Sequence, residues 1–163
     1  MRFPFARPVG ILAVAFLGAA ALPVAAAAQL RPTSVVAAEG AQRAIAAAVT
    51  EARAQGWAVS IAVVDPGGEL LAFLRMDGAP YSSVDIARGK ARTAARFRRP
   101  TRGLDSALAA GRWAILGFEG VTPVEGGVPV VVKGETVGAV GVSGATSAQD
   151  AQVAQAGARA IAP

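Results

Sequence analysis

A dense run of basic residues lies in the middle of the chain. The stretch GAPYSSVDIARGKARTAARFRRPTR, residues 78–102, carries seven basic side chains and no acid after Asp85. Guanidinium groups bind carboxylates and phosphates through charge-assisted, often bidentate hydrogen bonds. Long charged side chains are also mostly exposed. The run therefore indicates an anion-binding surface, a solvated helix face or a subunit contact, and its residues alone do not separate these interpretations.

Composition excludes several kinds of catalytic and metal chemistry. The 163-residue chain has no cysteine and no histidine. It therefore forms no disulfide, no thiolate or imidazole zinc site and no Ser-His-Asp triad. Its glycine loops match neither G-x-x-x-x-G-K-[ST] nor G-x-G-x-x-G, so a nucleotide site has little support. The chemistry that remains is that of arginine, lysine, carboxylate, hydroxyl, thioether and aromatic groups.

The basic run must be positioned by a small set of helices and hairpins. Apolar residues recur at helical spacing in the first predicted helix, with Thr33 or Ser34 as its cap. The turn sequences Asp-Pro-Gly-Gly and Lys-Gly-Glu each join two apolar or β-branched runs, as in a β-hairpin. Ser82 or Ser83 begins the basic helix, and Pro100 ends it. The predicted elements are a helix over 34–55, strands over 57–64 and 69–75, a helix over 83–97, a short helix over 104–110, two strands on either side of 133–135, and a closing helix capped at Ser147.

This order of elements predicts the fold class. Clustered hairpins favour a mainly antiparallel sheet with helices packed on it, an α/β sandwich of the α+β kind, rather than a doubly wound parallel sheet. Within the basic helix, Arg88, Arg92 and Arg96 share one stripe because residues four apart lie on the same helix face.

The first 28 residues have the three parts of a secretory signal. Arg2 and Arg7 precede an apolar run from Val9 to Leu22, and three alanines, residues 26–28, form a small-residue cleavage site. The run is too short and too broken for a comfortable span of about 20 residues, with an uncleaved anchor as the alternative. We predict a cleaved signal peptide over 1–28 and a single domain over 29–163. The mature protein is then periplasmic or secreted, with no stable membrane span.

The predicted mature chain has only a mild charge. Removal of residues 1–28 leaves 14 basic and 11 acidic residues, a net charge of +3. An excess this small does not by itself indicate DNA or RNA. Phe97 is also the one aromatic residue interleaved with the basic run as a stacking group. We therefore predict no nucleic-acid partner.

Four segments in order resemble one protein family. They are VVDPGGELLAFLRMDGAP, DIARGKARTAARFRRPT, EGGVPVVVKGETVGAVGVSG and a closing helix that begins near Ser147. The set, which spans most of 34–162, is similar to the GlcG/HbpS family of haem-binding proteins, also called the haem-degrading domain and similar to the C-terminal domain of PduO-type proteins. The resemblance implies a profilin-like sandwich with a five-stranded antiparallel sheet flanked by helices, usually assembled into homo-oligomers.

The resemblance also implies a function. It predicts an exported, non-catalytic protein that binds haem or another small-molecule tetrapyrrole, in haem or redox sensing or in sequestration. Two alternatives stay open. One is a cofactor-free oligomeric accessory protein linked to glycolate or alcohol oxidation, and the other is an enzyme that acts on a small oxidised acid.

A haem ligand assigns roles to particular residues. Arg92 and Arg99 are expected to pair with the propionates, Phe97 to contact the porphyrin ring, and Thr101 to lie at the pocket through the Arg-Pro-Thr-Arg corner. Because histidine and cysteine are absent, the predicted iron ligands are Met76 and Tyr81, with a lysine, Lys90 or Lys133, as a further option. Core filling or an interface is the alternative role for Met76 and Tyr81.

Overall fold

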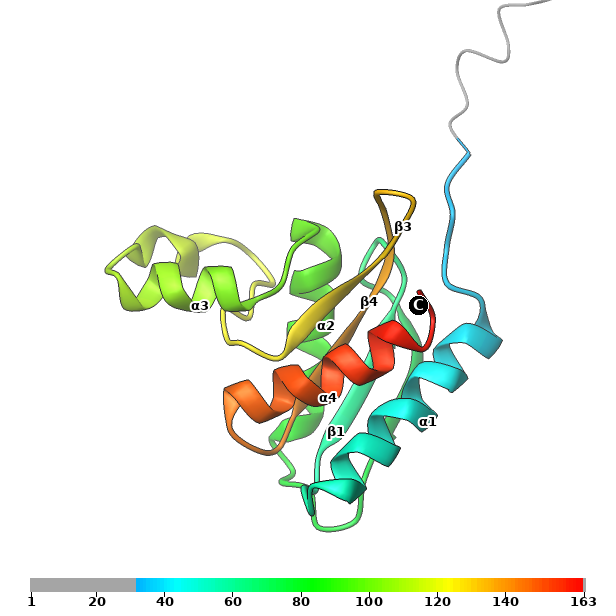
Figure 1. Ribbon diagram of the computed structural model, residues 1–163. Helices are drawn as coiled ribbons and strands as arrows, with labels where there is room; N and C mark the ends of the chain where they lie inside the picture. Colours follow the sequence, from blue (N-terminus) through cyan, green and yellow to red (C-terminus); the bar gives the residue numbers. More distant parts are fainter. Residues whose placement is uncertain (1–31, 163) are drawn as a thin grey trace, which may run out of the picture. The chain divides into compact units, whose positions relative to one another are not determined.

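One antiparallel sheet forms the centre of the molecule, and helices cover both of its faces (Figure 1). The computed structural model describes residues 32–162, of which 33–162 belong to one compact unit. The predicted signal segment lies outside the described residues. The elements are α1 (Ala38–Ala54), β1 (Ser60–Val64), β2 (Leu70–Arg75), α2 (Ser83–Phe97), α3 (Arg102–Ala109), the 3₁₀ helix η2 (Trp113–Gly117), β3 (Gly127–Val132), β4 (Glu135–Ser143) and α4 (Ser147–Arg159).

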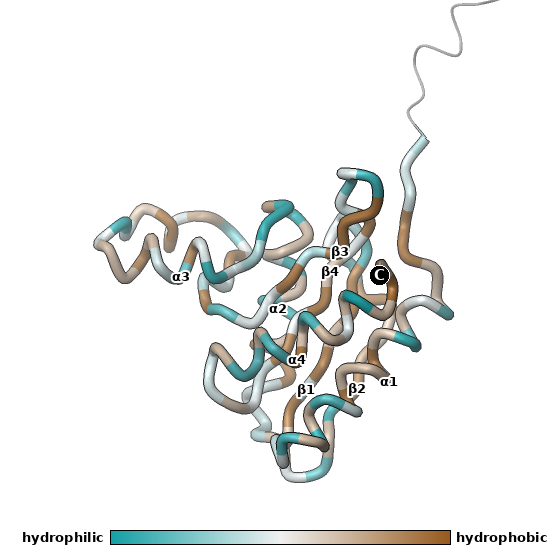
Figure 2. The backbone as a smooth tube through the Cα atoms, in the orientation of Figure 1, coloured by the Kyte–Doolittle hydropathy of each residue, from teal (hydrophilic) through white to brown (hydrophobic). Residues whose placement is uncertain are grey.

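The sheet has the strand order β2-β1-β4-β3. The two central strands pair antiparallel, with Ser60 opposite Ser143, and every residue of β1 is buried. Hydrophobic residues accordingly concentrate in the central strands (Figure 2). Each hairpin pairs as its turn sequence predicts, and in the first turn the N–H of Glu69 donates to the Asp65 carboxylate over 2.8 Å.

The expected α+β class is confirmed, but the expected fifth strand is wrong for the described residues. Four strands form there, the number of strand-like runs that the residue pattern itself contains. The chain between α3 and β3 folds as η2 and turns instead. Glycines at positive φ, at Gly111, Gly120 and Gly126, interrupt that segment and disfavour an extended ladder.

Helices α1 and α4 lie side by side on one face of the sheet (Figure 1). Their alanines let both helices approach the valines of the strands, and together these side chains form the larger core. The fully buried members are Ala41, Ala44, Ala48, Ala52, Val59, Ile61, Val63, Val140, Val142, Val153 and Ala154. Two details of capping differ from expectation: α1 begins after Ala37, which makes no side-chain cap, and Thr146 rather than Ser147 caps α4 through a capping box with Gln149.

Helix α2 covers the opposite face. Its alanines pack on Ala62, Val64 and Ala139, with Phe73 at the margin. The approach is close because β4 carries glycine at Gly141, where an added Cβ would lie 2.8 Å from the Ala91 Cα. The arginine-rich helix is therefore fixed directly on the sheet through its small residues, and Arg88 and Arg96 lie on its exposed surface.

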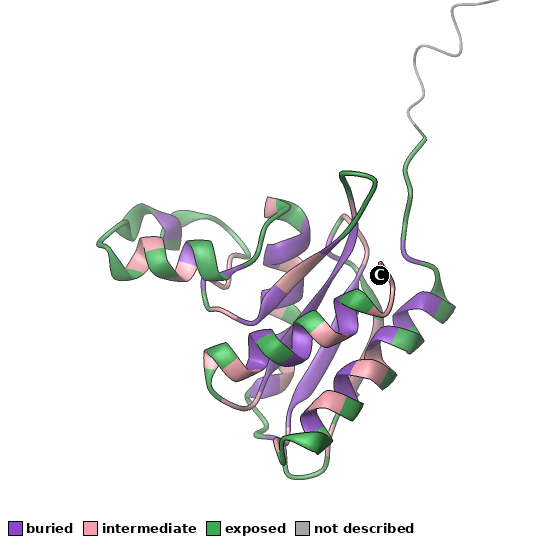
Figure 3. Cartoon of the chain, viewed as in Figure 1, coloured by how far each residue is buried: buried purple, intermediate pink, exposed green. Residues whose placement is uncertain are grey.

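Helix α3 and η2 extend from one side of the sheet and are largely exposed (Figure 3). Leu104 and Ile115 are their buried anchors. None of the helices in the described range is long and apolar enough to cross a bilayer.

Candidate functional site

A buried ion pair holds α2 in place. Lys90 on α2 and Asp150 on α4 each have a side chain that is 2% exposed, and the Nζ of Lys90 donates to the Asp150 Oδ2 over 2.8 Å. The other carboxylate oxygen accepts from the N–H of Ala145 over 3.0 Å. Gly126 makes room for the pair, because a Cβ there would lie 2.8 Å from the Lys90 Nζ.

Burial raises the pKa of the Asp150 carboxyl above its ordinary value. The hydrogen bond and charge of Lys90, together with the backbone N–H groups of Ala145 and Gly144, offset part of that rise. The pair links helices on opposite faces of the sheet, so it serves the structure. Because the Lys90 ammonium is bound to Asp150, it is not free to bind a ligand.

Thr101 anchors the start of α3 to the start of β3. The residue is fully buried, its hydroxyl accepts from the N–H of Gly127 over 2.9 Å, and its own N–H donates to the Gly127 carbonyl over 3.0 Å. Thr101 was predicted to lie at the ligand pocket. In the structure its hydroxyl and its N–H are both hydrogen-bonded to Gly127.

The three arginines of the α2 stripe, Arg88, Arg92 and Arg96, differ in whether they have hydrogen-bond or charge partners. The Nε of Arg96 donates to the Gly67 carbonyl over 2.7 Å, and its guanidinium lies 3.6 Å from Glu69. Arg88 lies 4.0 Å from Asp85, and both of these side chains are largely exposed. The Nε of Arg92, by contrast, is buried and has no hydrogen-bond partner within the described residues.

Arg92 lines a polar notch between α2 and the loop 120–122. The notch has a volume of about 330 Å³, and Arg88 and Thr122 also line it. A buried donor without an acceptor costs about 1–3 kcal/mol, but this Nε is buried and is therefore closed to a ligand in the notch. Asp85 also lines the notch. The anion-binding role of Arg92 stays a prediction.

The C-terminal end of α2 carries an exposed aromatic and basic surface. The rings of Phe97 and Phe118 lie 6.1 Å apart at 38°, and the guanidinium carbon of Arg99 lies 5.8 Å from the centre of the Phe97 ring. On η2, Trp113 is 69% exposed and Leu116 is 60% exposed. We call these five residues the aromatic–arginine surface: Phe97, Phe118 and Arg99 lie together, and Trp113 and Leu116 are grouped with them because η2 ends directly before Phe118. Side chains three apart eclipse each other in a 3₁₀ helix, so Trp113 and Leu116 share one face of η2.

Met76 and Tyr81, the predicted iron ligands, lie at the other end of α2. Met76 follows β2 and packs, partly buried, against the core under α1. Tyr81 precedes α2 and is 84% exposed, and the Arg75 guanidinium lies 4.3 Å from the centre of its ring. Helix α2 has 15 residues, which is about 22 Å of length between Tyr81 and Phe97.

The six predicted site residues therefore do not form one cluster. Phe97 and Arg99 lie together, Arg92 lies earlier on α2 beside the notch, Thr101 is internal, and the two iron-ligand candidates lie at the opposite helix end. Sequence reasoning missed Phe118, which sits in a glycine-marked loop without periodicity. Phe73, on β2, packs against the alanine core of α2.

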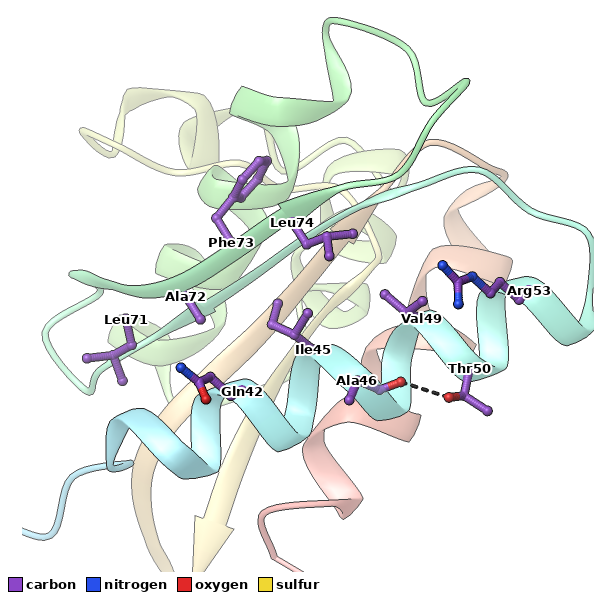
Figure 4. A pocket seen from close by; sticks show the side chains of 10 residues that line it. All are labelled: Gln42, Ile45, Ala46, Val49, Thr50, Arg53, Leu71, Ala72, Phe73 and Leu74. Carbon is purple, nitrogen blue, oxygen red and sulfur yellow. Dashed lines mark hydrogen bonds between the residues drawn. The ribbon is translucent and has the colours of Figure 1, made fainter.

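A second hollow lies along the free edge of the sheet, between α1 and β2 (Figure 4). It has a volume of about 650 Å³. Ile45 and Val49 on α1 face Leu74 on β2 across it. Arg53, from the last turn of α1, is the one arginine in its lining. The remaining lining residues are Gln42, Ala46, Thr50, Leu71, Ala72 and Phe73. The size of this hollow suits a small molecule, and the hollow offers one arginine, as the aromatic–arginine surface does.

The chain is similar to several known proteins in sequence and in structure. GlcG of Escherichia coli is 50% identical over 99 residues, which cover 61% of this chain and 74% of GlcG. A double mutant of HbpS from Streptomyces reticuli is 35% identical with a TM-score of 0.78, over 98% of this chain and 100% of that one. PduOC, solved as a complex with haem, is 26% identical with a TM-score of 0.72, over 78% of this chain and 96% of PduOC. The family model described as haem degrading protein HbpS-like matches residues 36–159. The chain therefore belongs to the HbpS-like family.

Proposed function

We propose that this chain is an exported, non-catalytic tetrapyrrole-binding protein, with haem as its ligand and the aromatic–arginine surface as the binding site. Haem binding by a relative supports the ligand class, because PduOC was solved as a complex with haem. The single observation that supports the location is the Phe97–Phe118 ring pair, covered by the Arg99 guanidinium.

The residues of this surface suit the ring of a porphyrin. A flat apolar ligand gains most from aromatic faces, which stack in offset or tilted arrangements. Phe97, Phe118 and Trp113 offer such faces, and Leu116 adds aliphatic area beside Trp113. Exposed apolar side chains gathered on one short segment mark an interaction site rather than ordinary surface.

One arginine of this surface suits a carboxylate. Arg99 lies beside the ring pair, where its guanidinium can bind a propionate through charge-assisted hydrogen bonds. Arg92 lies beside the notch instead, about 7.5 Å along the helix axis from Phe97 and on a different face of α2. The hollow beside α1 also offers one arginine, Arg53, but a single aromatic ring, that of Phe73.

A haemin titration tests the proposal. The full-length gene is expressed, the protein is purified from the periplasmic fraction, and an intact mass that begins at Gln29 checks export and cleavage. Absorbance from 350 to 450 nm is expected to show a saturable Soret change in the native protein. The variant Arg99→Glu is expected to weaken binding by about 10- to 100-fold, because a hydrogen bond to a charged group contributes about 1.5–3 kcal/mol.

The matched control is Arg53→Glu, which makes the same charge change beside the apolar hollow. It is expected to leave haemin affinity unchanged. Loss of binding in Arg53→Glu with normal binding in Arg99→Glu would place the ligand between α1 and β2. A spectrum equal to that of free haemin in buffer would exclude the function itself.

The exposed η2 residues also favour a second candidate function, a cofactor-free oligomeric accessory protein. Trp113 and Leu116 are large, apolar and exposed, as residues at a subunit contact are in an isolated chain. In that case Leu116→Asp is expected to halve the mass measured by light scattering, or to reduce it further. Arg96 is a poor choice for this test because its guanidinium is bound within its own chain. An unchanged mass in Leu116→Asp would exclude η2 as the contact.

A further inference from the structure

The chain has very few side chains that can coordinate a haem iron. Proteins hold this iron through histidine, cysteine thiolate, methionine or tyrosine. The full sequence contains no histidine and no cysteine, one tyrosine and two methionines, one of which is Met1. The candidates within the domain are therefore Met76 and Tyr81.

Both candidates are separated from the aromatic–arginine surface. Met76 lies after β2, partly buried against the α1 core, and its N–H donates to the Val59 carbonyl. Tyr81 lies at the start of α2 beneath the Arg75 guanidinium, whereas Phe97 and Arg99 lie at its end. The helix places about 22 Å between them. This separation exceeds the reach from a porphyrin iron to its own carboxylates, so one haem does not meet both ends of α2.

Neither Lys90 nor Lys133 is placed to supply an iron ligand at this surface. Lys90 is buried and bound to Asp150 over 2.8 Å, on the side of α2 that faces the sheet. Lys133 is exposed in the turn between β3 and β4. A lysine ammonium has three donor hydrogens and no free electron pair with which to coordinate a metal.

The side chains of the aromatic–arginine surface contact the porphyrin ring and its carboxylates rather than the metal. The ring faces of Phe97, Phe118 and Trp113 contact a porphyrin plane whether or not it contains iron. The guanidinium group of Arg99 binds a carboxylate, and a metal-free porphyrin has the same carboxylates. Affinity from these contacts is independent of the central atom.

We infer that this chain recognises the porphyrin by its ring and carboxylates and not by its iron, so that its ligand class is dicarboxylate porphyrins in general. The inference rests on the proposed function. It separates this chain from a haem protein with a protein-derived axial ligand. It also explains why Phe97, Phe118 and Arg99 can form a site at a helix end that lacks any iron-coordinating side chain.

Parallel titrations test the inference. The native protein is titrated with haemin, followed by absorbance, and with metal-free protoporphyrin, followed by porphyrin fluorescence. The two dissociation constants are expected to agree within about threefold, because a coordinate bond from the chain would favour haemin by tenfold or more for each 1.4 kcal/mol it contributes. Arg99→Glu is expected to weaken both ligands by the same factor.

The variants Tyr81→Phe and Met76→Leu detect coordination directly. Both preserve size and apolar character, so they test the oxygen and the sulfur rather than the packing. Their haemin spectra and affinities are expected to equal those of the native protein. Tight haemin binding with no protoporphyrin binding, or a Soret change in either variant, would overturn the inference and leave the proposed function in place. If neither haemin nor protoporphyrin binds, the proposed function fails as well.

Discussion

Replacement of Lys90 by methionine is expected to lower the free energy of unfolding by about 3–5 kcal/mol at pH 8. Methionine is unbranched and fills the volume of the lysine stem, so the change removes the ammonium with little loss of packing. The Asp150 carboxylate then stays buried with only the N–H groups of Gly144 and Ala145 as partners. An uncompensated buried charge is among the largest penalties that one substitution can cause.

The same variant is expected to regain stability as the pH falls. Burial already raises the pKa of Asp150, and loss of Lys90 removes the hydrogen bond and the charge that lower it. The folded chain therefore holds the Asp150 proton more tightly than the unfolded chain, whose ordinary pKa is 3.8. The contribution of this group to stability is fully present below that value and is lost as the pH rises through the higher folded pKa. Urea denaturation at pH 5 and pH 8 measures the difference in free energy of unfolding between the variant and the native protein. This difference is expected to be larger at pH 8.

Two further variants control for packing and for charge. Asp150→Asn combined with Lys90→Met leaves no buried charge and is expected to recover much of the loss, since a buried ion pair is often replaceable as a unit. Arg88→Met makes a comparable change at an exposed position of the same helix and is expected to shift stability by less than about 0.5 kcal/mol. Equal stability of Lys90→Met and Arg88→Met at pH 8 would contradict a buried charge pair.

Gly141→Ala is expected to destabilise the fold by about 3 kcal/mol or more. The added Cβ would lie 2.8 Å from the Ala91 Cα and closer still to the backbone carbonyl of Ala87. These are backbone atoms, so no side-chain rotation relieves the clash and the whole of α2 must move away from β4. Such a shift would also disturb the Lys90–Asp150 pair. The urea midpoint measures the effect.

Gly103→Ala is the matched control for this steric argument. Gly103 lies in α3 with nothing within 4 Å of an added Cβ. Alanine there is expected to stabilise the protein by up to about 1 kcal/mol, because glycine is the poorer helix former. Native-like stability of Gly141→Ala would show that α2 does not rest directly on β4.

The local elements of this fold were predictable because their signals are local. Asp65 and the residues after it specify the first hairpin turn, and Pro100 ends the arginine-rich segment as expected. The residue pattern contains four strands, and the four strands formed; the fifth came from the family resemblance alone. The loop that becomes η2 has no regular period and gave no warning of a 3₁₀ helix.

The candidate site was less predictable because its members meet only in three dimensions. Asp150, in the first turn of α4, has the sequence signature of a residue that serves the helix dipole. One signal was available for Lys90: it shares the spacing of Ala87, Ala91 and Ala94, so it falls within the apolar stripe of α2. Phe118 and Phe97 are far apart in the chain, and no pattern links them.

The order of the strands also determines when the domain can finish folding during synthesis. The central pair joins β1, near the start of the domain, to β4, near its end, so the sheet stays incomplete until Ser143 has been made. At about 5–20 residues per second, translation from β1 to β4 takes roughly 4–16 s. Throughout this interval the chain has one hairpin and no central pairing. The proposed export would require the chain to pass through a translocation channel before β1 closes on β4, because the completed sheet is too wide to be threaded.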